Sequence, residues 1–202
     1  MTHATVREAE RTLAKIDPVM RSVIARHGPC PLGGGRPDYF DTLSWSIVSQ
    51  QLSTKAASTI GKRVLELTGQ TKMSATHISS ATHKQLRAAG LSNNKARFLQ
   101  ALAEEALDGR LNFRSLAQLS DEAVIDRLVK LKGIGRWTAE MFLMFALKRS
   151  DVASPDDVGL QRAMYELYGL RKRPSPRRFH EIARPWSPYR TVACWYLWRT
   201  VD

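Results

Sequence analysis

Two glycines and a pair of aspartates carry the clearest chemistry in the sequence. Gly133 and Gly135 stand in LVKLKGIGRWTAE, and Asp156 and Asp157 follow in SPDDVG. Glycines lack Cβ atoms, so the backbone can turn tightly there and approach a phosphate, which the N–H groups of a following helix attract. The pattern predicts a hairpin that holds DNA and an aspartate that does chemistry.

The composition favours a polyanionic partner. The chain has 31 Lys and Arg against 19 Asp and Glu, which gives a net charge of +12 at pH 7 and a sequence pI near 10.2. Nucleic-acid-binding proteins commonly have this balance, but ribosomal proteins and heparin binders share it. Charge therefore favours nucleic acid without assigning a function.

Cysteine and histidine usage argues against metal and disulfide chemistry. Cys30 and Cys194 cannot supply the four thiolates of an iron–sulfur cluster, and the five histidines show no metal-ligand spacing, so we expect neither such a cluster nor zinc. No nucleotide-binding glycine pattern is present, so no nucleotide cofactor is expected. Two cysteines in a chain of this size favour a reducing, intracellular setting, which is the cytoplasm and nucleoid of a bacterium or the nucleus of a eukaryote.

The hydrophobic pattern predicts a soluble, all-α fold. Apolar residues recur at helical spacing in nearly every segment, strand alternation is not convincing, and no apolar run reaches about 18 residues. The polar N-terminus gives no indication of secretion, and no membrane association is expected. Asp17-Pro18, Ser53 and Ser92 are expected to start helices. Helices are predicted over residues 40–51, 121–129, 136–147, 175–183 and 188–200.

Five segments together resemble the helix–hairpin–helix (HhH-GPD) superfamily of DNA glycosylases, and most closely its alkylation-repair branch, the 3-methyladenine DNA glycosylase II family. The likeness covers most of the chain from residue 40 onward. The segments are SIVSQQLSTKAA at 46–57, LRAAGLSNNKARFLQALA at 86–103, LVKLKGIGRWTAEMFLMFAL at 128–147, PDDVGLQRA at 155–163 and WSPYRTVACWYLWR at 186–199.

The resemblance implies a fold of two helical lobes with the active site in the cleft between them. The chain would be a single glycosylase module over residues 1–202 that acts as a monomer. A lobe of about residues 36–115 would be inserted against a lobe formed by about 1–35 and 116–202. Larger members also have an N-terminal β-sheet domain, for which 202 residues leave no room.

The resemblance also implies a reaction of base-excision repair. The protein would flip alkylated purines, such as 3-methyladenine and 7-methylguanine, out of double-stranded DNA and release them by hydrolysis, which leaves an abasic site. Asp157 matches the catalytic aspartate, and its place at a helix start favours its negative charge. The simpler alternative is that Asp157 only caps the helix, a task that Asp156 could equally perform.

Two tryptophans match positions that bear on the chemistry. Relatives that also cleave the DNA backbone have a lysine where this chain has Trp137, so the resemblance implies a monofunctional enzyme without a lyase step. Trp198 matches a second pocket tryptophan, and an aromatic face attracts a cationic alkylated base. Both could instead be core aromatics, which is how we interpret Trp45, Trp186 and Trp195.

A flipped base leaves a gap in the stack that relatives fill with a wedge side chain. Gln51 and Leu52 occupy that position, at the turn between two predicted helices. The alternative is that Leu52 is simply buried.

The hairpin is expected to grip the DNA backbone. Its amides from Gly133 to Arg136, including Ile134, would bind a phosphate, and the resemblance places a structural Na⁺ or K⁺ on the backbone carbonyls of Val129, Leu131 and Ile134 when DNA is bound. Lys132, Arg136 and Lys95 are candidates for further phosphate contacts, although exposed basic side chains are often merely solvated.

Two other functions fit parts of the pattern. One is a glycosylase for mismatched or deaminated bases, against which the missing iron–sulfur cysteines and Trp137 count. The other is a non-catalytic helix–hairpin–helix module that only binds DNA, which leaves Asp157 unexplained. The sequence does not rank the lesions.

Overall fold

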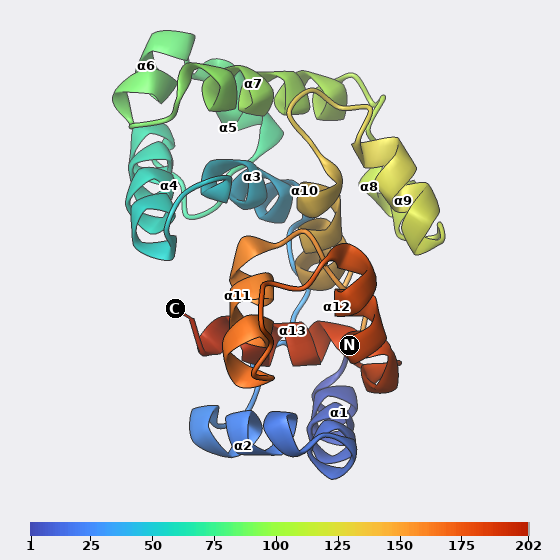
Figure 1. Ribbon diagram of the computed structural model, residues 1–202. Helices are drawn as coiled ribbons and strands as arrows, with labels where there is room; N and C mark the ends of the chain where they lie inside the picture. Colours follow the sequence, from blue (N-terminus) through green and yellow to red (C-terminus); the bar gives the residue numbers. More distant parts are fainter. Residues whose placement is uncertain (202) are drawn as a thin grey trace. The chain divides into compact units, whose positions relative to one another are not determined.

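The computed structural model describes residues 1–201, and helices are the only regular secondary structure in that range (Figure 1). The all-α prediction is therefore confirmed. None of the helices in residues 1–201 has both the length and the apolar composition needed to cross a membrane. The helices are α1 (His3–Ile16), α2 (Pro18–His27), α3 (Tyr39–Ser49), α4 (Thr54–Thr68), α5 (Ala75–Ser80), α6 (His83–Ala88), α7 (Asn93–Leu107), α8 (Phe113–Leu116), α9 (Asp121–Leu128), α10 (Arg136–Met141), η1 (Phe142–Ala146), α11 (Val158–Leu167), α12 (Pro176–Ala183), η2 (Arg184–Trp186) and α13 (Arg190–Arg199).

Most helices begin after a short polar side chain that accepts a hydrogen bond from the first turn. Asp17 caps α2 with Pro18 at the first helical position, Ser53 caps α4, and Ser92 caps α7. Such caps satisfy N–H groups that a helix leaves without an internal partner. The three helix starts predicted from the sequence are confirmed.

The chain packs into two compact units. We call residues Pro37–Leu147 the central unit, and Met1–Arg36 together with the chain from Lys148 onward the terminal unit. The sequence-based division placed the second boundary near residue 115, whereas the central unit extends to Leu147. The segment after residue 115 belongs to this unit because α9 packs against α10, and α10 and η1 pack against α3.

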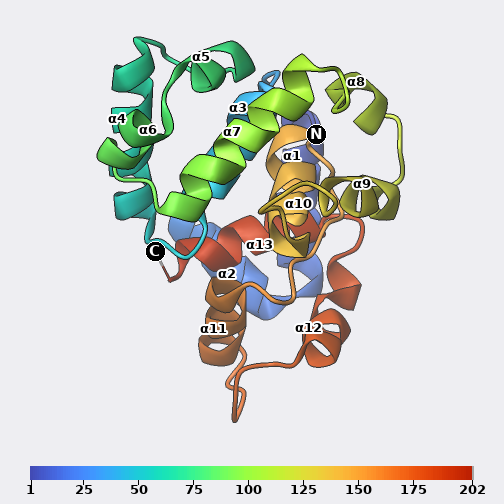
Figure 2. The same ribbon diagram turned by 90° about the horizontal axis from the view of Figure 1, so that it is seen from above.

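Helix α3 forms the core of the central unit. Its residues Leu43, Ile47 and Val48 are fully buried, and it packs against α4, α7, α10 and η1. Figure 2 shows α7 lying across α3 with α4 beside them. The Trp45 ring packs so closely on Gly61 of α4 that a Cβ there would come within 2.0 Å of it. Helix α3 is therefore a firm base for the turn that follows it.

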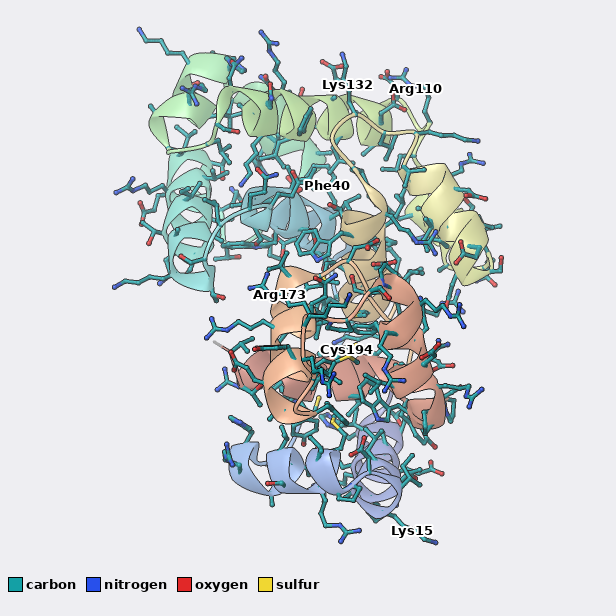
Figure 3. All side chains as sticks on the ribbon, in the orientation of Figure 1. Lys15, Phe40, Arg110, Lys132, Arg173 and Cys194 are labelled. Atoms are coloured by element: carbon teal, nitrogen blue, oxygen red, sulfur yellow. The ribbon has the colours of Figure 1, made fainter. Side chains whose placement is uncertain are left out.

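Helix α13 forms the core of the terminal unit. It packs against α1, α2 and α11, and it buries six of its residues, including Cys194, which Figure 3 labels. Neighbouring Tyr196 is also buried, and its hydroxyl donates to the Glu10 carboxylate at 2.7 Å and to the Gly28 carbonyl at 2.8 Å. Contacts on several sides explain why the helix lacks one clear apolar stripe.

Three predicted helices have different limits in the structure. The helix predicted over 40–51 ends at Ser49, since Gln50 and Gln51 already belong to the turn before α4. The predicted helix over 136–147 is α-helical only to Met141, and Phe142–Ala146 form a π-helix. Residues around the whole circumference of this segment are buried, so the apolar face seen in the sequence does not fix the hydrogen-bond pattern. The helix predicted over 188–200 begins at Arg190, because Pro188 still lies in the turn after η2.

Asp17 joins distant parts of the terminal unit through both carboxylate oxygens. Oδ1 caps α2, while Oδ2 accepts hydrogen bonds from the Tyr168 hydroxyl at 2.7 Å and from Trp186 Nε1 at 2.8 Å. The Trp186 side chain is buried, so its N–H would have no water as a replacement partner.

We predict that Asp17→Ala lowers the free energy of unfolding by about 3 kcal/mol, because the loss of a cap and of two further hydrogen bonds leaves a buried donor unsatisfied. Urea denaturation measures this. The control is Ser175→Ala, which removes only the cap of α12 in the same unit and should cost about 1 kcal/mol. Equal losses in the two variants would contradict the role given to Asp17.

Candidate functional site

Asp157 is the N-cap of α11 and is almost completely buried, with 9% of its surface exposed. Its Oδ1 accepts a hydrogen bond from the Leu160 backbone N–H at 2.7 Å and a second from Trp198 Nε1 at 3.0 Å. The neighbouring Asp156 is exposed and does not cap the helix. Asp157 is therefore both a cap and the partner of a tryptophan 41 positions away, which a cap alone does not require.

Trp198 reaches Asp157 because α13 packs against α11. The sequence analysis missed a third residue of this contact, Gly159. A Cβ on Gly159 would lie 3.1 Å from Asp157 Oδ1, which is a tight contact, and 3.4 Å from Trp198 Cδ1, which is an ordinary one, so glycine leaves the carboxylate undisturbed. The available signal was a glycine in the first turn of a helix, two positions after Asp157.

Hydrogen-bond donors and a helix dipole converge on one oxygen of Asp157. Two N–H groups point at one oxygen, and the amino-terminal end of α11 adds the positive end of its dipole. Both donors are fixed by packed helices, so Asp157 has a set orientation. A negative charge held this way in a nearly dry place can stabilise a positive charge that develops beside it.

The hairpin between α9 and α10 lies in the central unit, and its two glycines meet different needs. Gly133 has a φ of +80°, and a Cβ there would fall 2.1 Å from the ring of Phe98. Gly135 has an ordinary φ of −93°, and a Cβ there would meet nothing within 4 Å. Gly133 is thus required by the fold, whereas neither the backbone nor packing within the chain requires Gly135.

The hairpin leaves the start of α10 open to an anion. Gly135 is the N-cap and has no side chain to accept from the first turn, unlike the polar caps of α4, α7 and α9. The Ile134 N–H donates within the hairpin to the Leu131 carbonyl at 3.2 Å, and the Ile134 side chain is buried. The hairpin is therefore held by its own hydrogen bond and by a buried side chain. The backbone N–H groups of the first turn of α10 point out of the amino-terminal end of that helix, where anions are attracted.

The carbonyls expected to hold a monovalent cation come from this same hairpin. Val129 directly follows α9 and is 41% exposed, so solvent reaches it, and the Leu131 carbonyl has a second lone pair besides the one bonded to Ile134. Neutral carbonyl oxygens suit Na⁺ or K⁺. These residues fit the expected ion, while residues 1–201 contain no cluster of three or more His, Cys, Asp or Glu that could hold a metal.

The basic residues of the hairpin are placed differently from one another. Lys132 is exposed on the loop between α9 and α10 (Figure 3). Arg136, also expected to contact phosphate, instead pairs with Glu122 at 2.7 Å and with the buried Glu140 at 3.2 Å. Hydrogen bonding to Glu122 is the main cause that raises the pKa of the Arg136 guanidinium. Lys132 is thus exposed and Arg136 is paired with two carboxylates, and a phosphate contact of either residue stays a prediction.

Trp137 is half-buried as the second residue of α10 and belongs to the central unit, whereas Asp157 and Trp198 belong to the terminal unit. The structure thus joins Trp198 directly to Asp157 and places Trp137 just after the hairpin. Of the tryptophans expected to serve packing, Trp186 is buried, and Trp195 stacks edge to face on Tyr196 with ring centroids 4.9 Å apart.

Gln51 and Leu52 form the tip of the turn between α3 and α4. Gln51 has a φ of +55°, a left-handed conformation that is uncommon outside glycine, and its side chain is exposed. Leu52 is 39% exposed, which contradicts the alternative that it is simply buried. An exposed leucine on a strained turn is available to insert into a ligand.

Lys95, expected to contact phosphate, is oriented toward this turn instead. Its Nζ donates to the carbonyls of Val48 at 2.7 Å and Gln50 at 2.6 Å. Both carbonyls lie at the end of α3, where helical carbonyls lack internal partners and attract a cation. Lys95 thus bonds to a segment about 45 residues earlier in the chain, and its contact with phosphate stays a prediction.

A cavity of about 530 Å³ lies in the terminal unit at the loop between α11 and α12. Its lining includes the basic residues Arg171, Lys172 and Arg173, the last of which Figure 3 labels. Gln161 of α11 also lines it and donates to the Pro155 carbonyl at 2.8 Å. The cavity adds to the positive surface of the chain on the helix that Asp157 caps.

Comparison with known proteins gives consistent matches. Residues 44–188, which include the hairpin and Asp157, match the family described as HhH-GPD superfamily base excision DNA repair protein. The chain is 31% identical to the alkylbase DNA glycosidase-like protein mag2 of Schizosaccharomyces pombe, over 96% of this chain and 92% of that protein. The structure of the S. pombe 3-methyladenine DNA glycosylase Mag1 in complex with abasic DNA is similar, with a TM-score of 0.86, 32% identity and 96% of each chain covered. A DNA-3-methyladenine glycosidase from Bacillus halodurans gives a TM-score of 0.75 and 38% identity, over 96% of this chain and 89% of that one.

Alanine substitutions at the two hairpin glycines should differ in their effect on the free energy of unfolding. Gly133→Ala should lower the free energy of unfolding by about 2 kcal/mol or more, because a Cβ there clashes with Phe98 and the positive φ disfavours alanine. Gly135→Ala should change it by no more than about 0.5 kcal/mol, since the Cβ enters open space. Thermal and urea unfolding of the two variants measure the difference, and similar losses would show that the interpretation of Gly135 is wrong.

Proposed function

This chain belongs to the HhH-GPD superfamily of base excision DNA repair proteins, and we propose that it is a monofunctional DNA N-glycosylase for alkylated purines. Its substrates would be 3-methyladenine, 7-methylguanine and related lesions in double-stranded DNA, and its product an abasic site. The similarity along nearly the whole length of a 3-methyladenine DNA glycosylase bound to abasic DNA supports both the activity and the DNA partner. The observation that carries the proposal is the buried Asp157 carboxylate held by Leu160 and Trp198.

Asp157 would act by opposing charge on the sugar. As the bond between C1′ and the base nitrogen lengthens, both electrons of the bond go to the base, and the sugar becomes an oxocarbenium-like cation. A purine alkylated on a ring nitrogen starts out cationic and leaves neutral. Water then bonds to C1′ and loses a proton. A carboxylate fixed by two N–H donors needs no reorganisation to stabilise the cation as it forms.

The tryptophans support the choice of substrate and the absence of a lyase step. Trp137 occupies the position after the hairpin where an amine would be needed to form a Schiff base with the sugar, and an indole cannot do so. Trp198 holds Asp157 through its N–H, which leaves its ring as an aromatic surface beside the carboxylate. Aromatic faces favour cationic rings, which alkylated purines have and normal purines lack.

A base in a duplex has to leave the stack before it can reach Asp157, at a cost of a few kcal/mol. Gln51 and Leu52 would enter the gap and keep the base out, and their exposure supports this role. The hairpin would hold the neighbouring phosphate through the N–H groups near Gly135, with Lys132 and a monovalent cation on the carbonyls adding positive charge.

We predict that Asp157→Asn abolishes base release. The asparagine Oδ1 can still accept from Leu160 and Trp198, so the change removes the charge and keeps the cap. The single-turnover rate of 7-methylguanine release from methylated duplex should fall by about three orders of magnitude. The Kd for the same duplex should stay within about threefold.

The matched control is Asp156→Asn, which changes an exposed carboxylate next door and should release base at the normal rate. Normal turnover in Asp157→Asn would reject the mechanism. Absence of base release by the unaltered protein on every methylated substrate, with tight duplex binding, would instead favour the non-catalytic module.

Borohydride trapping tests the absence of a lyase step. Because Trp137 replaces the amine, incubation with methylated DNA and borohydride should give no covalent adduct, and the DNA strand should stay intact until alkali cleaves it at the abasic site. A bifunctional glycosylase with its own substrate serves as the positive control. A trapped adduct or strand cleavage without alkali would contradict the monofunctional assignment.

A further inference from the structure

The turn between α3 and α4 is exposed at its tip and held at its base. At the tip, Gln51 is in the left-handed region with φ +55° and Leu52 is 39% exposed. The Leu52 N–H donates to the Ser49 carbonyl at 3.2 Å, which closes the turn. A left-handed conformation is strained for a residue other than glycine, and an exposed leucine forgoes the stabilisation that burial would give. Something has to hold this conformation.

Gln50 ties the turn to the hairpin. Its Nε2 donates to the Gly133 carbonyl at 2.9 Å and to Thr138 Oγ1 at 3.0 Å. Thr138 is buried in the first turn of α10, so both acceptors are fixed. The two bonds span more than 80 residues and join the turn directly to the glycine that the hairpin fold requires.

Lys95 holds the same turn from the side of α7. Its two hydrogen bonds to the Val48 and Gln50 carbonyls fix the last turn of α3 and the residue after it. Burial lowers the pKa of Lys95, consistent with an amine drawn in from solvent toward these acceptors. Charge-assisted bonds of this kind are worth about twice neutral ones. All of these residues lie in the central unit, so their placement does not depend on the terminal unit.

We propose that Gln50 and Lys95 are positioning residues that keep Gln51 and Leu52 ready for insertion into the duplex and join them to the phosphate-binding hairpin. The inference rests on the proposed function. Ordering a loose turn at the moment of insertion would consume binding energy needed to flip the base, and a turn ordered beforehand avoids that loss. The hairpin and the turn then engage DNA as one rigid surface.

The test uses Gln50→Ala and Lys95→Met in the full chain. Two readouts are taken: the single-turnover release of 7-methylguanine, and the fluorescence of 2-aminopurine next to a tetrahydrofuran abasic analogue, which reports unstacking without any catalysis. We expect the release rate to fall by about tenfold to hundredfold in each variant, with a matching loss of the fluorescence increase. The Kd for undamaged duplex should stay within about threefold of the unaltered protein.

Two controls in the same unit make similar bonds elsewhere. Gln100 Nε2 donates to the Ala81 carbonyl at 3.2 Å, and Arg87 Nη1 donates to the Leu91 carbonyl at 2.6 Å. Gln100→Ala and Arg87→Met should therefore lose stability comparably but keep the normal release rate and fluorescence. Lys95→Arg retains a cationic donor and should restore most of the rate that Lys95→Met loses.

A double-mutant cycle separates positioning from general stability. In a background with both Gln51→Ala and Leu52→Ala the inserting side chains are already absent, so adding Gln50→Ala or Lys95→Met should slow release by no more than about twofold. Full additivity, or slowing no greater than in Gln100→Ala and Arg87→Met, would overturn the proposal. Failure of the proposed function would give a different result. The unaltered protein would then release no base, while the fluorescence increase would still depend on Gln50 and Lys95.

Discussion

The proposed reaction depends on one contact, in which a single oxygen of Asp157 accepts hydrogen bonds from the Leu160 backbone N–H and from Trp198 Nε1. Both donors are held from outside the site. The end of α11 is tied through Tyr168 to Asp17, and the start of α13 through Arg190 to Asp151, with N–O distances of 2.6 and 2.9 Å. The Arg190 guanidinium also helps to keep the pKa of Asp151 below its usual range, against the opposing effect of burial. Burying a carboxylate costs free energy, and the two fixed hydrogen bonds to Asp157 offset part of that cost.

In the central unit, side chains from distant segments likewise hold parts of the backbone in place. Its hairpin and its α3–α4 turn both contain strained or open backbone, and each is stabilised by side chains from elsewhere in the unit. Phe98 packs on Gly133, Arg136 pairs with two glutamates, and Gln50 bonds to the hairpin carbonyl. Regular helices thus carry the stability, while the short connections between them present polar backbone and Leu52 to a partner.

The sequence was enough to predict the features that depend on residues close together in the chain. The cap at Asp17, the glycine hairpin and the aspartate at the start of α11 all follow from residues a few positions apart, so the sequence was sufficient for them. The bonds of Lys95 and the hydrogen bond from Trp198 to Asp157 join residues more than 40 positions apart, which no short pattern reveals. The π-helix after Met141 likewise follows from packing on all sides.

The most direct measurement of the central claim compares two abasic-site analogues that differ in charge. A duplex with a cationic pyrrolidine in place of the sugar imitates the oxocarbenium ion, and one with neutral tetrahydrofuran has nearly the same shape. The account predicts that the protein binds the pyrrolidine duplex at least about a hundredfold more tightly, and that Asp157→Asn removes this preference while leaving the affinity for the tetrahydrofuran duplex unchanged. Equal affinity of the unaltered protein for both duplexes, or a preference that survives in Asp157→Asn, would contradict it.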